Sequence, residues 1–245
     1  MRISMQLVLI IPTYNEVKTI GQVVTEWHAE ISRFLPVADF RILVINDGSK
    51  DRSAQVVEEA AKKHPEILLH THANRGHGQS CLAGYRIAQE MGSEFVMQID
   101  SDGQCDPVFF PAFWAERGTW AVYGHRRQRH DGFARVVISR VLRMVMTVLT
   151  GTKVHDTNVP YRIYPVTMAV EAANRIQPTF DLANIAMAIL LEPKGFKEIP
   201  IHFRDRTGGT ASVKLFGFAK KAVRLVRDLK TLKASGAISS AAARA

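Results

Sequence analysis

Short apolar runs alternate with longer amphipathic segments through the first half of the chain. An apolar run of this length, bounded by turn residues, is typical of a buried strand, whereas apolar residues that recur every three or four positions predict a helix. The predicted strands are residues 7–11, 40–45, 67–70 and 95–99, and the predicted helices are residues 17–34, 51–63 and about 79–91. This alternation predicts an α/β fold in which helices cover a mostly parallel sheet.

Two later segments have a different pattern. In residues 133–150 and 214–233, polar and basic side chains fall on one helical arc and apolar side chains on the opposite arc. Such a helix can lie on an anionic membrane surface, or it can pack its apolar stripe on the protein core. Both interpretations stay open for 133–150, and we favour the membrane for 214–233. Residues 234–245 are rich in Ala and Ser, which predicts a frayed tail.

Length and charge narrow the class of protein. The 245 residues suffice for one large α/β domain or two small ones, and the formal net charge is +9. Residues 124–143 and 204–233 hold much of the positive excess. Basic surfaces suit nucleic acid, anionic lipid or phosphorylated substrates. Because few aromatic residues are interleaved with these basic residues, we expect no nucleic-acid partner.

The sequence also predicts where the protein resides. No apolar stretch reaches the ~18 residues that suggest a membrane-spanning helix. The apolar run at 7–11 is too short for the core of a signal peptide and is followed by Pro12. Cys81 and Cys105 form no metal-binding spacing and fit a reducing compartment. These features favour the cytoplasm.

The most informative chemistry follows the run at 95–99. It ends in Asp100 and Asp102, with Gly103 directly after. Open α/β sheets bind ligands beyond the carboxyl ends of their strands. Two carboxylates there suit a hard divalent cation such as Mg²⁺ or Mn²⁺, which can in turn hold a diphosphate. A plain polar turn uses the same residue types, so the interpretation depends on the other strand ends.

The first predicted strand ends in Ile-Pro-Thr-Tyr-Asn-Glu at 11–16. We expect Pro12 to end the strand, Tyr14 to offer a ring for stacking on a base, and Glu16 to accept hydrogen bonds. The alternative is a simple helix start, in which Asn15 caps the helix and Glu16 lies in its first turn.

The second and third predicted strands also end in polar segments. Asp47 can accept hydrogen bonds from ribose hydroxyls or base N–H groups, although Asn-Asp-Gly-Ser is also an ordinary turn. Glycines in 74–79 let backbone N–H groups approach a phosphate at a helix N-terminus, although the segment could be a flexible loop. Each segment alone could be an ordinary turn, loop or helix start, but four polar segments at one sheet edge favour a shared site.

These four motifs, in this order and spacing, resemble family 2 glycosyltransferases with the GT-A fold, a Rossmann-like sheet flanked by helices. The resemblance covers roughly residues 6–214. It implies a nucleotide-diphosphate sugar donor, linked to UDP or GDP, and it makes Asp100 and Asp102 the DxD motif that holds Mg²⁺ or Mn²⁺. The donor-nucleotide residues are then expected to be Pro12, Tyr14, Glu16, Asp47, Arg75, Gly76, Gln79, Asp100 and Ser101.

The second half resembles one branch of that family, the polyprenyl-phosphate glycosyltransferases, which include dolichyl-phosphate mannosyl- and glucosyltransferases. The matching residues are Gly124 and Arg126, then Asp156, Tyr161 and Arg162, then Arg206, Gly209, Ser212 and Lys214. The chain departs from the pattern at Pro160, where a Gly is usual, and in one extra residue between Gly209 and Ser212. Both departures concern the acceptor side. The Q-x-x-R-W motif of processive polysaccharide synthases is missing, which argues against a polymerase.

The resemblance implies a polyprenyl-phosphate acceptor. Its phosphate is already anionic, so it needs positioning more than deprotonation. Arginines can clamp the acceptor phosphate or the donor diphosphate, and the metal can neutralise the leaving group. We expect in-line attack on the anomeric carbon with inversion, and no general base is assigned. The expected catalytic residues are Asp102, Asp156, Arg126 and Arg206, and the expected acceptor-phosphate residues are Arg162, Arg204, Ser212 and Lys214.

This scheme predicts the organisation of the chain. Residues 1–213 would form the GT-A domain, 214–233 a basic helix, and 234–245 a flexible tail. The basic helix would attach the enzyme peripherally to the cytoplasmic face of the membrane, where the lipid phosphate is presented.

Three other functions stay open. A glycosyltransferase with a soluble acceptor would need a carboxylate base. A nucleotidyltransferase would prefer a Gly-rich loop after the first strand, and a basic nucleic-acid-binding protein would show salt-sensitive binding. Cys105 is expected to pack rather than react, and His77 either lines the donor pocket or is solvated. No zinc-like spacing is found among His70, His72, His77, His125, His130 and His155.

Overall fold

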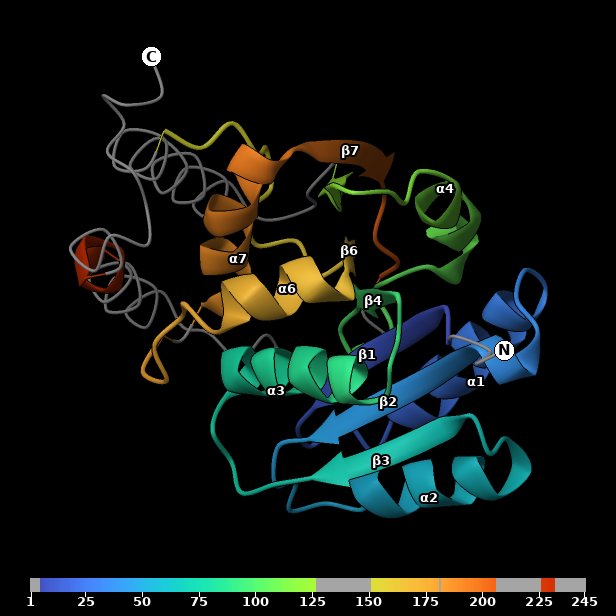
Figure 1. The fold of residues 1–245 in the computed structure, drawn as a ribbon. Helices are drawn as coiled ribbons and strands as arrows, with labels where there is room; N and C mark the ends of the chain where they lie inside the picture. The colour runs from blue at the N-terminus through green and yellow to red at the C-terminus, as the bar shows by residue number, and fades with distance from the viewer. Residues whose placement is uncertain (1–4, 127–150, 181, 206–225, 232–245) are drawn as a thin grey trace.

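The computed structural model describes residues 5–126, 151–180, 182–205 and 226–231. Within them, a seven-stranded sheet forms the centre of the molecule and helices pack on both of its faces (Figure 1). The strands are β1 (Leu7–Thr13), β2 (Phe40–Asn46), β3 (Ile67–Thr71), β4 (Phe95–Gln98), β5 (Ala121–Arg126), β6 (Arg162–Pro165) and β7 (Phe196–Ile201).

The helices alternate with the strands as the apolar pattern predicts. They are α1 (Ile20–Ser32), α2 (Ser53–Lys63), α3 (His77–Glu90), α4 (Phe110–Ala115), α6 (Val166–Ala173) and α7 (Ala183–Leu191), with 3₁₀ turns η1 (Val37–Asp39), η2 (Pro107–Phe109) and η3 (Glu192–Lys194). The first helix begins later than predicted. The Glu16 carbonyl accepts from the amides of Thr19 and Ile20 at 3.1 and 3.0 Å, so a turn precedes the helix.

The sheet confirms the predicted α/β class. Its strand order is β3-β2-β1-β4-β6-β5-β7. β1 runs parallel to β2 and β4, β2 to β3, and β5 to β7, whereas β6 is antiparallel to both β4 and β5. β6 runs opposite to both β4 and β5, and β7 is parallel to β5, so β5 and β7 point the same way as β4. The carboxyl ends of these parallel strands therefore meet at one edge of the sheet.

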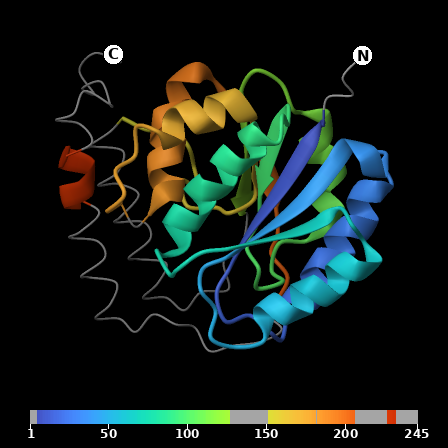
Figure 2. The same ribbon diagram turned by 60° about the horizontal axis from the view of Figure 1, so that its bottom comes forward.

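The helices form two layers. α1 and α2 lie together on one face, whereas α3 lies on the other face beside α6 and α7 (Figure 2). Right-handed crossovers require this arrangement, because the chain moves outward from β1 to β3 and then returns to β4. α3 lies directly on β1: a Cβ atom added at Gly84 would come within 3.1 Å of the Ile10 side chain.

Pro12 does not end the first strand as expected. It lies inside β1 and pairs in register with Ile45 of β2. β1 pairs with β4 only as far as Ile10 and Gln98. The Ile10 carbonyl faces β4, since it accepts from the Ile99 amide, and strand alternation turns Pro12 toward the same side. There the ladder has already ended, so the missing N–H of proline costs no sheet hydrogen bond.

The two predicted amphipathic helices lie largely outside the described residues. Residues 226–231 are helical, and Leu229 among them is buried, which agrees with its place on the predicted apolar arc. The rest of 214–233 and all of 133–150 lie outside the described residues, so their membrane role stays a prediction. In the described part of the chain, no helix has the length and apolar character needed to cross a bilayer.

Candidate active site

The candidate site lies where β1 and β4 separate. Their pairing stops at Ile10 and Gln98, while β1 continues to Thr13. The helix that leaves β1 and the helix that arrives at β4 cover opposite faces of the sheet (Figure 2). Open α/β sheets bind ligands at such a switch point, in the crevice outside the carboxyl ends of their strands.

The loop after β1 is fastened to the loop after β2. The Asn15 amide donates to Ser49 Oγ at 3.0 Å, and Asn15 Oδ1 accepts from the Lys50 amide at 2.8 Å. The Glu16 amide donates to Ser53 Oγ at 2.9 Å. Asn15 has a positive φ of 56°, which Asn adopts more readily than most residues. Asn15 therefore joins two loops rather than capping α1.

This loop presents two of the expected donor residues. The side chain of Tyr14 is exposed, and Glu16 is partly buried beside Thr19, whose Oγ1 lies 3.2 Å from Glu16 Oε2. Pro12, expected at the nucleoside, is buried within β1. Tyr14 is thus the residue of this loop that has a ring free to stack on a base.

Asp47 is buried at the end of β2 and holds the loop after β3. Its two carboxylate oxygens accept from the backbone amides of Arg75 and Gly76 at 2.7 and 2.9 Å. His72 Nδ1 lies 3.5 Å from the same carboxylate. The amides expected to meet a phosphate are therefore already bonded to Asp47. A carboxylate has about four lone-pair sites, so Asp47 keeps acceptor capacity for a nucleoside.

Asp100 begins the loop after β4. Its Oδ1 accepts from His77 Nε2, at the start of α3, at 2.9 Å. Burial opposes ionisation of Asp100, but the charges of His77 and Arg126 outweigh it and lower the pKa of the carboxyl. Asp100 is therefore ionised at neutral pH. Sequence reasoning left His77 between a pocket role and solvation; the structure gives it a direct contact with the DxD motif.

Asp102 is fixed by its own turn. Its Oδ1 accepts from the Gln104 amide at 3.1 Å, and Gly103 adopts a φ of 81°. Ser101 between the two acids is buried, and its carbonyl accepts from Thr19 Oγ1 at 2.9 Å. The backbone that carries both acids is thereby tied to the start of α1.

These residues fit a hard divalent cation. Two carboxylates supply the oxygen ligands that Mg²⁺ and Mn²⁺ prefer. Burial, together with Asp100, raises the pKa of the nearby Cys105 thiol well above its usual value, so the thiol stays protonated. Desolvation disfavours the imidazolium of His77, but Cys81 and Asp100 raise its pKa well above the usual value. A protonated His77 donates to Asp100 and is not a metal ligand.

The structure brings two of the expected catalytic residues together at the end of β5. Arg126 Nε and Nη2 donate to the two oxygens of Asp156 at 2.6 and 3.0 Å, a bidentate pair. The pair is largely buried, and the Arg126 guanidinium lies 5.0 Å from the centre of the Phe203 ring. Arg126 and Asp156 are far apart in the sequence. The antiparallel pairing of β5 with β6 brings the segment before β6, which carries Asp156, to the edge where β5 ends.

Arg204, expected at the acceptor phosphate, connects three elements. Its guanidinium donates to Glu26 Oε2 on α1 at 2.6 Å and to Asp106 Oδ1 after β4 at 2.8 Å. The Arg204 amide donates to the Gln104 carbonyl at 3.0 Å. Sequence reasoning missed Glu26 and Asp106, because nothing in their local pattern separates them from ordinary surface acids.

Arg162 requires a correction. It has no exposed surface, and its Nε donates to the Val159 carbonyl at 2.7 Å. Its Nη1 donates to the Asn184 carbonyl and to the Tyr164 hydroxyl, both at 3.0 Å. A guanidinium enclosed in this way does not reach an acceptor phosphate. Arg162 instead holds the start of β6 against α7.

The remaining expected residues divide into two groups. The side-chain amide of Gln79 lies 3.4 Å from the carbonyls of Gln177 and Phe180, which joins α3 to the second half of the fold. Gly76 and Arg75 lie on the exposed loop described above. Three residues lie outside the described part of the chain: Arg206, Ser212 and Lys214.

Comparison with known sequences supports the family resemblance. The family model for glycosyl transferase family 2 matches residues 8–169. The chain is 27% identical over 239 residues to the undecaprenyl-phosphate 4-deoxy-4-formamido-L-arabinose transferase of Shewanella sediminis, covering 91% of this chain and 65% of that protein. It is 28% identical over 160 residues to the protein of the same name from Proteus mirabilis, covering 64% and 48%. The chain thus spans about half to two thirds of the length of these curated relatives.

Solved structures support the fold. Glucosyl-3-phosphoglycerate synthase from Mycobacterium tuberculosis, in complex with Mn²⁺, UDP-glucose and phosphoglyceric acid, superposes with a TM-score of 0.65 at 15% identity, covering 93% of this chain and 79% of that one. Mannosyl-3-phosphoglycerate synthase from Rubrobacter xylanophilus gives a TM-score of 0.64 at 15% identity, covering 96% and 76%. At this identity the likeness concerns the fold alone.

Proposed function

The chain belongs to glycosyl transferase family 2, and from this premise we propose that it transfers a sugar from a nucleotide-diphosphate sugar to a polyprenyl-phosphate lipid. One observation carries the proposal: the ionised Asp100 lies with Asp102 at the crevice between β1 and β4, and two arginines lie at the same sheet edge. The relatives named as undecaprenyl-phosphate transferases support the acceptor class.

The donor would bind along the loops after β1, β2 and β4. Tyr14 offers its exposed ring to the base, and Asp47 retains acceptor sites for the nucleoside, with a UDP or GDP donor. Asp100 and Asp102 would hold Mg²⁺ or Mn²⁺ against the diphosphate. When bound, this cation supplies Lewis-acid stabilisation of the charge that develops on the leaving nucleoside diphosphate.

The acceptor phosphate would bind near Arg126 and Arg204, with Arg206, Ser212 and Lys214 as further proposed contacts. A phosphate oxygen attacks the anomeric carbon in line with the bond to the nucleoside diphosphate. The new carbon–oxygen bond forms as the old one breaks, so the configuration inverts. No proton has to be removed from the phosphate. Asp156, which engages Arg126 bidentately, orients that guanidinium and is not positioned as a free base.

The lipid acceptor gives the basic segments a purpose. We propose that 133–150 and 214–233 attach the catalytic domain peripherally to the cytoplasmic face of the membrane. Basic residues near an anionic leaflet each contribute about 1 kcal/mol, which suits segments that carry several of them. The polyprenyl chain can then stay in the bilayer while its phosphate enters the crevice.

A direct transfer assay tests this proposal. The purified full chain would be incubated with liposomes that contain undecaprenyl phosphate, a panel of UDP- and GDP-sugars, and Mn²⁺, Mg²⁺ or EDTA. We expect a lipid-linked sugar, detected by mass spectrometry, with one donor class and only in the presence of a divalent metal. Flotation of the protein with the same liposomes would report the membrane attachment.

The other outcomes discriminate between the remaining functions. Transfer to water-soluble alcohols but not to the lipid phosphate would favour a soluble acceptor. A metal-dependent thermal shift with a donor but no transfer to either acceptor class would contradict the proposed acceptor. No binding of any nucleotide sugar would contradict the enzymatic proposal as a whole.

A further inference from the structure

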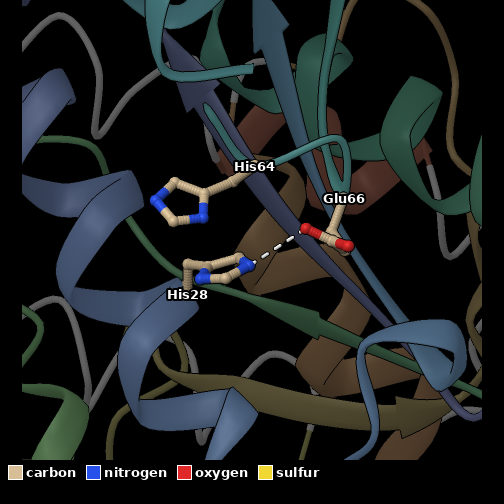
Figure 3. A group of neighbouring side chains, drawn as sticks. All are labelled: His28, His64 and Glu66. Atoms are coloured by element: carbon tan, nitrogen blue, oxygen red, sulfur yellow. Dashed lines mark hydrogen bonds and ion pairs between the residues drawn. The ribbon is translucent and has the colours of Figure 1, made fainter. Parts of the chain in front are cut away.

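A second group of metal-binding side chains lies away from the candidate active site. His28 belongs to the last part of α1, His64 directly follows α2, and Glu66 directly precedes β3 (Figure 3). Glu66 stands at the amino end of its strand. The group therefore lies at the opposite edge of the sheet from Asp100, which follows the carboxyl end of β4.

The three side chains converge on one point. One ligand atom from each lies within 4.8 Å of the others. His28 Nε2 and Glu66 Oε2 are 3.1 Å apart, and the centres of the two imidazole rings are 4.1 Å apart. Zinc binds nitrogen and oxygen at about 2.0–2.2 Å, so ligands around one ion lie somewhat over 3 Å apart. His28 and Glu66 are already at about this separation, and the His64 nitrogen has to move closer.

His64 has a ligand nitrogen to spare. Among the described residues, its imidazole takes part in no hydrogen bond, and its ring lies tilted against that of His28, at an interplanar angle of 38°. Histidine binds a transition metal through an imidazole nitrogen, and His64 can offer such a nitrogen to an ion that His28 and Glu66 also contact.

The backbone holds this geometry in place. The His64 carbonyl accepts from the Ile67 amide at 2.9 Å, and the Glu66 carbonyl accepts from the Ile42 amide at 2.9 Å. The side chain of His28 is largely buried, and its ring packs 5.5 Å from the centre of the Phe40 ring. Ligands on such ordered elements lose little further freedom when an ion binds.

We propose that His28, His64 and Glu66 form a second metal site, which binds a Zn²⁺-class transition-metal ion. Two imidazole nitrogens and one carboxylate suit Zn²⁺, Ni²⁺ or Co²⁺, whereas the DxD oxygens suit Mg²⁺ or Mn²⁺. With three protein ligands, the fourth position is left for water. The ion would join α1 to the connection between α2 and β3, so its role would be to stabilise this edge of the fold.

The ligand set gives no sequence signal. His28 and His64 are far apart in the chain and form none of the short spacings by which zinc sites are recognised. The site becomes visible only when the β1-α1-β2-α2-β3 connections bring the end of α1 beside the start of β3.

The test uses Zn²⁺ alone and a variant that lacks both carboxylates of the DxD motif. The full chain carrying Asp100→Asn and Asp102→Asn would be titrated with Zn²⁺ by calorimetry, and Co²⁺ would report nitrogen ligation by its visible absorption. We expect one ion per chain. Adding His64→Ala should weaken Zn²⁺ binding by at least roughly tenfold to hundredfold, because the loss of an outer-shell group alone costs that much. Glu66→Gln should weaken it similarly.

The matched control is His70→Ala in the same background. His70 is an exposed histidine on the strand that Glu66 precedes, and it lies outside the group of three. This variant should bind Zn²⁺ with unchanged affinity. Because His64 is partly exposed, His64→Ala should leave the fold intact. Far-UV circular dichroism would verify this. Absence of Zn²⁺ binding in the parent, or equal binding in parent and His64→Ala, would overturn the proposal.

Discussion

The proposed donor side and the proposed acceptor side of the candidate site hold their acids by different means. On the donor side, the backbone amides of Arg75 and Gly76 hold Asp47. On the acceptor side, the Arg126 side chain holds Asp156, and that of Arg204 holds Asp106. Backbone amides cannot leave without moving the loop, whereas a guanidinium can exchange one anion for another. The proposed donor side is therefore preformed, whereas the guanidinium groups of the proposed acceptor side suit exchange with an incoming phosphate.

The largest effect should come from the DxD motif, in which the His77 side chain holds Asp100 and the Gln104 amide holds Asp102. Asp102→Asn or Asp100→Asn removes a carboxylate proposed to hold the cation. We expect sugar transfer to fall by on the order of a thousandfold, comparable to the loss of a strong transition-state contact. Transfer to undecaprenyl phosphate in the presence of Mn²⁺ would measure it. Asp39→Asn, at the other end of the sheet, is the control and should keep full activity. Full metal-dependent transfer by Asp102→Asn would exclude this role.

The acceptor side should be the more sensitive to loss of an ion-pair partner. Asp156→Asn leaves the largely buried Arg126 without its counter-ion, which should lower the free energy of unfolding by roughly 3 kcal/mol. Urea unfolding would measure the change. Glu171→Gln breaks an exposed ion pair with Lys194 and should leave the free energy unchanged within error. If Asp156→Asn were as stable as the unmodified chain, the Arg126–Asp156 pair would not stabilise the fold.

The donor side should respond mainly in ligand binding. Asp47→Asn keeps the size of the side chain but directs an NH₂ group at a backbone amide that needs an acceptor. We expect the free energy of unfolding to fall by about 2 kcal/mol, because this carboxylate is buried. The thermal shift caused by a UDP- or GDP-sugar should also fall. A variant that binds the donor as well as the unmodified chain would show that Asp47 does not organise the donor loop.

The smallest effect concerns Asp106 and depends on pH. Burial opposes its ionisation, but the hydrogen bond from Arg204 and the Val108 amide outweigh it and lower the pKa of this carboxyl. A depressed pKa in the folded state adds stability above the unfolded value of about 4. That stability disappears as the pH falls through the folded-state pKa.

Asp106→Asn tests this directly. At pH 7 the variant should be about 1 kcal/mol less stable than the unmodified chain, and the difference should shrink steadily below about pH 4. Urea unfolding at several pH values would follow it. A difference that grows in acid would have the opposite sign and would show that Asp106 is not stabilised by Arg204.

Most of the donor side is predictable from the sequence because its residues follow strands. A buried apolar run fixes where a strand ends, so Asp47, Asp100 and Asp102 could be placed at one edge without coordinates. The strand order confirms that placement. The contact of His77 with Asp100 depends instead on how α3 sits against β4, for which the local pattern offers no signal.

The acceptor side was less predictable because tertiary packing decides the role of each arginine. Arg162 and Arg126 both match motif positions of the family. Arg162 is enclosed by backbone carbonyls, whereas Arg126 pairs with the carboxylate of Asp156. Pro12 was misplaced for a similar reason. A proline usually ends a strand, but it is tolerated here because the neighbouring strand stops first.

The early end of the β1–β4 ladder also matters for protein engineering. The separation of β1 from β4 results from strand order and strand length. The exposed positions of loops 14–19 and 99–106, with Asp100 and Asp102 kept, are therefore the place to redesign the proposed donor specificity while the buried strands stay as they are. A library restricted to these loops would keep the scaffold constant and let selection act on specificity alone.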